Sequence, residues 1–114
     1  MYDLAELTQK LQFLAEKYQL AKIILFGSYA RGEADEHSDI DLVLDMEGSP
    51  VLGWEFFEME EDFQKTLQKP VDILTLEEVK RATSYLMREV RQHIGEEGII
   101  LYEKKSASKG LLLS

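Results

Sequence analysis

The first part of the chain alternates between a helical and an extended pattern of apolar residues. Four leucines lie three or four positions apart: Leu4, Leu7, Leu11 and Leu14. This spacing predicts a helix over residues 3–18, and Asp3 with Glu6 forms a capping pair at its start. Residues 21–26 (AKIILF) are a short apolar run that ends abruptly at Gly27, which predicts a buried strand.

An acidic and aliphatic segment then leads into a second long helix. Residues 39–45 (DIDLVLD) alternate acidic and aliphatic side chains at their start, which predicts a half-buried strand. Residues 48–50 (GSP) interrupt the pattern. The predicted helix after them has an apolar stripe with spacings of three and four: Leu52, Phe56, Met59, Phe63 and Leu67. Residues 69–70 (KP) end this helix.

The last third of the chain adds a strand, a helix and a strand. Residues 71–74 (VDIL) predict a short strand, and Thr75 with Glu78 forms a capping box for a helix running towards Ile94. Two glycines bracket a turn before the last predicted strand: Gly95 and Gly98, followed by residues 99–102 (IILY). This order of elements predicts an α/β (α+β) fold in which helices flank a small mixed β-sheet.

The length of 114 residues fits one compact domain. We expect a single domain over residues 1–103 and a flexible C-terminal tail over residues 104–114, whose lysines and leucines show no periodicity. The absence of cysteine excludes disulfides, thiolate zinc sites and a cysteine nucleophile. Because we find no leader-like start and no apolar run of membrane-spanning length, we expect a soluble cytoplasmic protein that does not contact a membrane.

The net charge of −9 is concentrated in one region. Between Glu33 and Asp62 the sequence has twelve acidic residues and no Lys or Arg. Such a region repels a phosphate backbone unless cations intervene, so nucleic-acid binding is not expected. We interpret most of residues 55–62 as a solvated helix face, and Asp39 with Asp41 as a divalent-metal site; a docking surface for a basic partner is the other interpretation of the region.

Asp39 and Asp41 are the first candidates for chemistry. They lie two positions apart on a predicted strand, so both carboxylates point to the same face. Carboxylates this close repel each other unless a cation neutralises them, and hard oxygen ligands suit Mg²⁺, which also binds substrate phosphates. An Asp-x-Asp pair alone is also common at solvated strand ends, so the residues around it decide between a metal site and a solvated strand end.

Three features supply that context. Gly27 and Ser28 directly follow a strand, where glycine lets an oxyanion approach the backbone and the serine hydroxyl can bind phosphate. Ten residues separate Ser28 from Asp39, enough to bring the next strand beside this turn. Asp72 stands among aliphatic residues, and a carboxylate in a buried strand is costly unless paired or coordinated. The alternative interpretation of Gly27 is a glycine that only serves the turn after the strand. The alternative for Asp72 is an aspartate on an edge strand that faces water.

With these residues, the segment Leu25–Leu44 (LFGSYARGEADEHSDIDLVL) resembles the minimal nucleotidyltransferases of the DNA polymerase β-like superfamily. Their pattern is Gly-Ser, about ten residues, Asp-x-Asp and a third carboxylate on a later strand. The match includes residues 30–32 (ARG) and Ser38, and it covers residues 22–75 closely. The resemblance implies the polymerase β-like nucleotidyltransferase fold.

The resemblance also implies an enzyme that moves a nucleoside monophosphate from a nucleoside triphosphate to a hydroxyl and releases pyrophosphate. Asp39 and Asp41 would hold Mg²⁺ against the triphosphate, in a pair of metal ions. Asp72 would share the metal nearer the acceptor and help deprotonate the acceptor hydroxyl. The Gly-Ser pair would bind the β- and γ-phosphates. For Arg31, a contact with the same phosphates and a structural role are both open.

The small stand-alone members of this superfamily resemble the antitoxin halves of MNT–HEPN toxin–antitoxin pairs. That resemblance implies AMP transfer from ATP to a tyrosine of a partner HEPN ribonuclease toxin, in a hetero-oligomer with the toxin. Trp54 and Phe57 lie off the apolar stripe of the second long helix, and would either contact such a partner or be buried on a second side of that helix. The competing interpretations are a non-catalytic antitoxin that acts by binding and a small-molecule nucleotidyltransferase.

Overall fold

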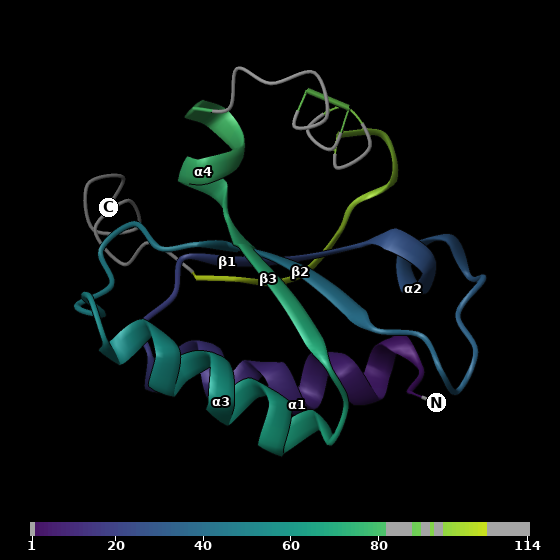
Figure 1. Cartoon of the computed structure of the whole chain (residues 1–114), viewed down its shortest axis with the longest axis horizontal. Coiled ribbons are helices and arrows are strands. Elements are labelled where there is room, and N and C mark those ends of the chain that lie inside the picture. Colours follow the sequence, from purple (N-terminus) through teal and green to yellow (C-terminus); the bar gives the residue numbers. More distant parts are fainter. Residues whose placement is uncertain (1, 82–87, 90–91, 93–94, 105–114) are drawn as a thin grey trace, which may run out of the picture.

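The computed structural model describes residues 2–81, 88–89, 92 and 95–104 of the chain (Figure 1). The helices are α1 (Leu4–Lys17), α2 (Gly27–Arg31), α3 (Glu55–Leu67) and α4 (Leu76–Arg81), and the strands are β1 (Lys22–Phe26), β2 (Ile40–Asp45), β3 (Val71–Thr75) and β4 (Ile99–Glu103). Residues 88, 89, 92 and 95–97 are also helical. The predicted combination of helices with four short strands is confirmed.

The four strands form one mixed sheet in the order β3-β2-β1-β4. Strand β1 pairs antiparallel with both β2 and β4, whereas β2 and β3 are parallel. Phe26 at the end of β1 lies opposite Asp41 of β2, and Asp41 lies opposite Asp72 of β3. The predicted mixed sheet is confirmed, and its register places the end of β1 and the starts of β2 and β3 at the same end of the sheet.

Helices cover both faces of the sheet, α1 and α3 on one face and α4 on the other (Figure 1). The main core joins fully buried residues of α1, β2 and α3: Leu7, Leu11, Leu14, Ile40, Leu42, Leu44, Met59, Phe63 and Leu67. Val43 points to the opposite face of β2, where α4 contributes buried Val79. Each such side chain contributes roughly 1.5–3 kcal/mol by leaving water, so this core fixes the position of β2.

Two helices begin with the capping boxes that the sequence predicts. At α1, the Glu6 amide donates to the Asp3 carboxylate at 2.8 Å, and the Asp3 amide donates to the Glu6 carboxylate at 3.3 Å. At α4, the Glu78 amide donates to the Thr75 hydroxyl at 3.1 Å, and the Thr75 amide donates to the Glu78 carboxylate. Each cap satisfies amide groups that have no partner within the helix, a stabilisation of about 1 kcal/mol.

Some predicted boundaries are wrong. The strand predicted from Asp39 begins at Ile40, and the stripe predicted from Leu52 is one member shorter because α3 begins at Glu55. Gly53 has a φ of +54°, which a right-handed helix does not accommodate, and Leu52 before it is 74% exposed. Gly95 is helical rather than part of a turn.

The helix predicted towards Ile94 is described only in parts, since residues 82–87, 90–91 and 93–94 lie outside the described residues. The predicted tail lies outside them from residue 105 onward, so the division at residue 103 stays a prediction. Within the described part of the chain, we find no helix that is long and apolar enough to cross a membrane.

Candidate active site

Residues from three separate segments meet at one end of the sheet. They follow β1, precede or begin β2, and begin β3: Gly27, Ser28, Asp39, Asp41 and Asp72. The antiparallel pairing of β1 with β2 and the parallel pairing of β2 with β3 bring them together. Gly27 and Ser28 are already the first residues of α2, so their backbone amides lie in a helix's first turn, where amides have no partner within the helix.

Gly27 lies directly against the Asp41 carboxylate. A Cβ atom added to Gly27 would lie 2.2 Å from Asp41 Oδ2 and 3.0 Å from its Cγ, well inside van der Waals contact. Gly27 also has a φ of +73°, in the left-handed region that residues with a side chain rarely adopt. Both the backbone conformation and the neighbouring carboxylate therefore require glycine at this position.

Asp41 is the carboxyl group most perturbed by its surroundings at this end of the sheet. Burial, and then the negative charges of Asp72 and Asp39, raise the pKa of Asp41 to about 6. The Arg31 guanidinium acts in the opposite direction and lowers the pKa of Asp41. The three carboxylates therefore influence one another, and a cation placed among them would relieve their repulsion.

This pKa predicts how stability depends on pH. The folded state holds the Asp41 proton up to about pH 6, whereas an unfolded chain releases it near 3.8, so stability falls as pH rises through that window. Because Asp41 is half-buried, we expect a loss of about 1–2 kcal/mol. Urea unfolding at several pH values should show this loss in the wild-type chain and its absence in Asp41→Asn. Equal pH dependence in both proteins would contradict the assignment.

Asp39 and Asp72 are more exposed than Asp41. The expectation that Asp72 lies in a buried strand is wrong, because β3 is the edge strand of the sheet and the Asp72 side chain is exposed. Asp39 lies one residue outside β2 and is also exposed. Within the described residues, no three Asp, Glu or His side chains are already arranged as ligands of one metal ion. What the register does establish is that Asp72 is the direct neighbour of Asp41.

Arg31, the last residue of α2, is held by two carboxylates. Its Nε lies 3.0 Å from Glu33 Oε1, and one terminal nitrogen lies 3.6 Å from Glu97 Oε2. Arg31 therefore has the structural role that was one of the two possibilities open from the sequence. Its contact with phosphate stays a prediction. Sequence reasoning missed Glu97, because it is distant in sequence and falls in a segment predicted as a turn.

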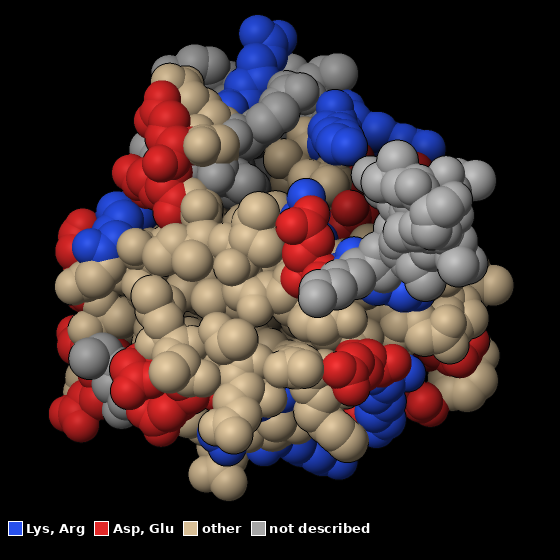
Figure 2. Space-filling view, turned by 180° about the vertical axis from the view of Figure 1, so that it is seen from behind, with Lys and Arg blue, Asp and Glu red and all other residues tan. Residues whose placement is uncertain are grey.

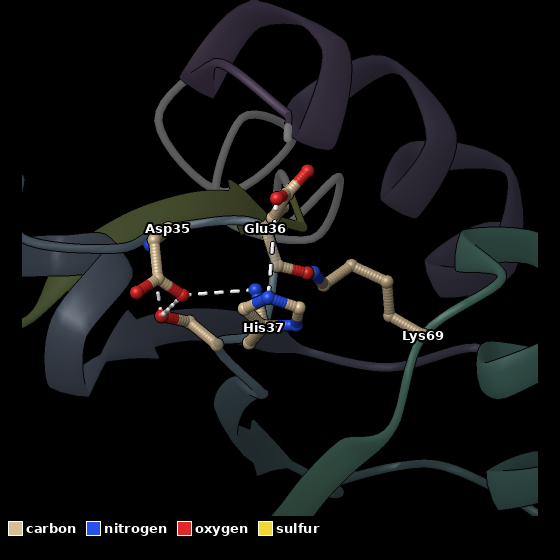
Figure 3. Close-up of polar contacts among 5 residues, drawn as sticks. Asp35, Glu36, His37 and Lys69 are labelled. Carbon is tan, nitrogen blue, oxygen red and sulfur yellow. Dashed lines mark hydrogen bonds and ion pairs between the residues drawn. The ribbon is translucent and has the colours of Figure 1, made fainter.

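A network of hydrogen bonds shapes the loop before Asp39 (Figure 3). The Asp35 carboxylate accepts from the His37 amide at 2.8 Å and from the Ser38 hydroxyl at 3.2 Å, and that hydroxyl accepts from the Asp35 amide. His37 is exposed, as expected of a loop residue. Asx-type bonds of this kind fix the conformation of the turn and so help to fix the position of Asp39, which follows it.

Lys69 joins this loop to β3, as Figure 3 shows. Its ammonium group donates to the Glu36 carbonyl at 2.9 Å and lies 5.8 Å from the centre of the Tyr29 ring. Lys69 precedes Asp72 by three residues, and the Ile40 amide donates to the Pro70 carbonyl beside it. The α2 helix, the loop before Asp39 and the strand with Asp72 therefore meet at one lysine.

Replacement of Lys69 by Met should misplace two carboxylates at once. We expect the nucleotide transfer that the sequence resemblance implies to fall about tenfold, since small displacements of positioned groups are costly to catalysis. The unfolding free energy should fall by only about 1 kcal/mol, the worth of one exposed charged hydrogen bond. Lys69→Arg keeps the donor and the cation and should retain most activity. Full activity of Lys69→Met would show that this contact does not position the site.

Comparison with known proteins identifies the family to which this chain belongs. Residues 7–101 match the family described as Nucleotidyltransferase domain. The chain is 38% identical to the protein adenylyltransferase MntA of Thermococcus cleftensis over 85 aligned residues. The aligned segment covers 74% of this chain and 85% of that relative.

Solved structures show the same fold. One is the crystal structure of a toxin–antitoxin with AMP-PNP, with a TM-score of 0.64, 22% identity, and coverage of 86% of this chain and 74% of the other. Another is tri-AMPylated Shewanella oneidensis HEPN toxin in complex with MNT antitoxin, with a TM-score of 0.60, 19% identity, and coverage of 96% and 78%. The chain therefore belongs to the nucleotidyltransferase domain family, as a minimal nucleotidyltransferase.

Proposed function

We propose that this enzyme transfers AMP from ATP to a hydroxyl group of a partner protein, with Asp39, Asp41 and Asp72 as its catalytic carboxylates. The observation that supports this most is the strand register, which sets Asp41 beside Asp72 at the sheet end where Gly27 leaves room for the Asp41 carboxylate. A carboxylate cluster next to a glycine-led turn combines a place for a divalent cation with a place for phosphate.

The donor set fits Mg²⁺. Three carboxylates offer hard oxygen ligands, two of them exposed, and the raised pKa of Asp41 reflects negative charge that a cation would offset. In this proposal Asp39 and Asp41 would hold Mg²⁺ for the triphosphate, and Asp72 would contribute a ligand on the side of the acceptor. When bound, Mg²⁺ would neutralise charge on the triphosphate and on the leaving pyrophosphate.

The chain's own residues then have separate roles. The acceptor oxygen attacks the α-phosphorus of ATP, the bond from that phosphorus to the oxygen shared with the β-phosphate breaks, and pyrophosphate leaves. The acceptor proton passes to Asp72, whose exposure lets it pass the proton on to water. Gly27 and Ser28 bind the β- and γ-phosphates through backbone amides and the serine hydroxyl. Arg31 reaches phosphate by exchanging Glu33 or Glu97 for it.

The proposed acceptor is a tyrosine of a HEPN ribonuclease toxin, which AMP would inactivate, so that the chain acts as an antitoxin. The support comes from relatives: one is named a protein adenylyltransferase, and a HEPN toxin in complex with a structurally similar MNT antitoxin is tri-AMPylated.

Intact-mass spectrometry separates this proposal from an antitoxin that only binds. The chain would be incubated with ATP, Mg²⁺ and the product of its neighbouring gene, which this proposal expects to be a HEPN toxin. Added mass on the toxin in multiples of AMP, together with pyrophosphate release, is the expected result. A stable complex without added mass would favour the binding-only antitoxin. AMP found only on small molecules would favour a small-molecule nucleotidyltransferase.

A further inference from the structure

Three large apolar side chains lie exposed around the start of α3. Leu52, Trp54 and Phe57 are 74%, 70% and 71% exposed, and we call them the aromatic patch. Tryptophan and phenylalanine each offer an area of roughly 150–250 Å², so leaving both in water is costly. Contiguous exposed apolar groups of this size are typical of surfaces that bind another molecule.

The turns that lead into α3 hold these residues close together. Trp54 and Phe57 lie one helical turn apart, and the Phe57 amide donates to the Trp54 carbonyl at 3.1 Å. The Glu55 amide likewise donates to the Leu52 carbonyl at 3.0 Å, which holds Leu52 in the same turn. The inward stripe of α3 is complete without them: Met59, Phe63 and Leu67 are fully buried. The alternative that α3 is buried on two sides is therefore wrong.

The surroundings of the aromatic patch are acidic. Glu55, Glu58 and Glu61 are exposed on the same helix, and the sequence has no Lys or Arg between Glu33 and Asp62. Figure 2 shows Lys and Arg side chains interspersed with Asp and Glu on the back of the molecule. If two copies of this chain paired through the aromatic patch, the acidic residues around one patch would face those around the other. Nucleic acid or an anionic membrane would be repelled by the same acidic residues.

We propose that the aromatic patch is the docking surface for the partner protein that receives AMP, through an apolar pocket rimmed by lysine and arginine. This inference rests on the proposed function for the identity of the partner. Aromatic anchors within a ring of charged groups are the usual source of affinity in such interfaces. Electrostatic attraction between acidic and basic rims would add speed and specificity.

The docking surface and the catalytic end are separate. Trp54 precedes α3, whereas Asp72 follows its other end, and the 13 residues of α3 span about 20 Å. Figure 1 shows the start of α3 and the α2 helix on opposite sides of the molecule. Loss of the aromatic patch should therefore weaken partner binding without disturbing the carboxylates. The expected kinetic result is a higher KM for the toxin at an unchanged kcat.

The test uses the full chain and the HEPN toxin. Binding is measured by calorimetry in an Asp41→Asn background, which prevents AMP transfer during the titration. The double variant Trp54→Ala/Phe57→Ala should bind at least about tenfold more weakly, and its KM in the active background should rise by a similar factor. The control is Ile100→Ala, which removes a 53% exposed apolar side chain from β4, at the opposite edge of the sheet. The thermal midpoint of each variant checks that the chain still folds.

Three results would overturn the docking proposal: unchanged affinity of the double variant, equal weakening by Ile100→Ala, or no binding of the wild-type chain to the toxin. Self-association of the wild-type chain that the double variant abolishes would assign the patch to a second copy instead. Weakened binding by the double variant, with no AMP added by the wild-type chain, would keep the docking surface and reject the proposed function alone. The two proposals therefore fail in distinguishable ways.

Discussion

Asp41→Asn is expected to lower nucleotide transfer on the order of 10³-fold while the protein stays folded. The amide removes the charge that would hold Mg²⁺ but keeps nearly the same shape, so the contact with Gly27 is retained. It also removes the repulsion from Asp72 and Asp39, so the variant should be more stable than wild type at neutral pH. Initial rates with labelled ATP and urea unfolding together measure both effects.

Asp45→Asn is the matched control for this substitution. Asp45 lies on the same strand at the opposite end, where its carboxylate accepts only from the nearby Glu47 amide among the described contacts. Its amide variant should keep most of the activity. If Asp41→Asn were folded and transferred AMP at the wild-type rate, the assignment of Asp41 would have to be abandoned.

Gly27→Ala should have the second-largest effect. Its methyl group would lie 2.2 Å from Asp41 Oδ2, so the carboxylate or the β1–α2 turn must move. We expect transfer to fall at least about 100-fold, the usual result of a displacement near 1 Å in a catalytic group. The left-handed backbone adds a loss of about 1–2 kcal/mol in unfolding free energy.

Gly32→Ala separates the two causes. Gly32 has the same φ of +73°, but an added Cβ there meets nothing within 4 Å. It should show the backbone cost in urea unfolding and retain most of its activity. If both alanine variants lost activity equally, the contact between Gly27 and Asp41 would not be what the site requires. If neither did, the phosphate-binding role of this turn would be in doubt.

The sequence was sufficient to predict those features that depend on residues close together along the chain. The capping boxes at Asp3 and Thr75 join groups three residues apart, so local spacing reveals them. The burial of Ile40 and Leu42 follows from period-two alternation on β2, which also separates them from Asp41. The Gly-Ser and Asp-x-Asp spacing indicated the family for the same reason, because both motifs lie within β1, β2 and the segment that connects them.

What the sequence could not predict depends on distant parts of the chain. Whether Asp72 is buried is decided by the place of β3 at the edge of the sheet, and its pairing with Asp41 by a parallel register. The Arg31–Glu97 ion pair joins α2 to the segment before β4, and no local pattern signals it. Leu52 fits the helical spacing, but Gly53 adopts a conformation that keeps it out of α3.

The most direct test of the account is a crystal structure of the chain with Mg²⁺ and a non-hydrolysable ATP analogue. We predict Mg²⁺ on the carboxylates of Asp39 and Asp41, with Asp72 facing the α-phosphate and the β- and γ-phosphates at Gly27 and Ser28. Nucleotide bound at another surface, or phosphates at this turn with no metal on either Asp39 or Asp41, would contradict the central claim.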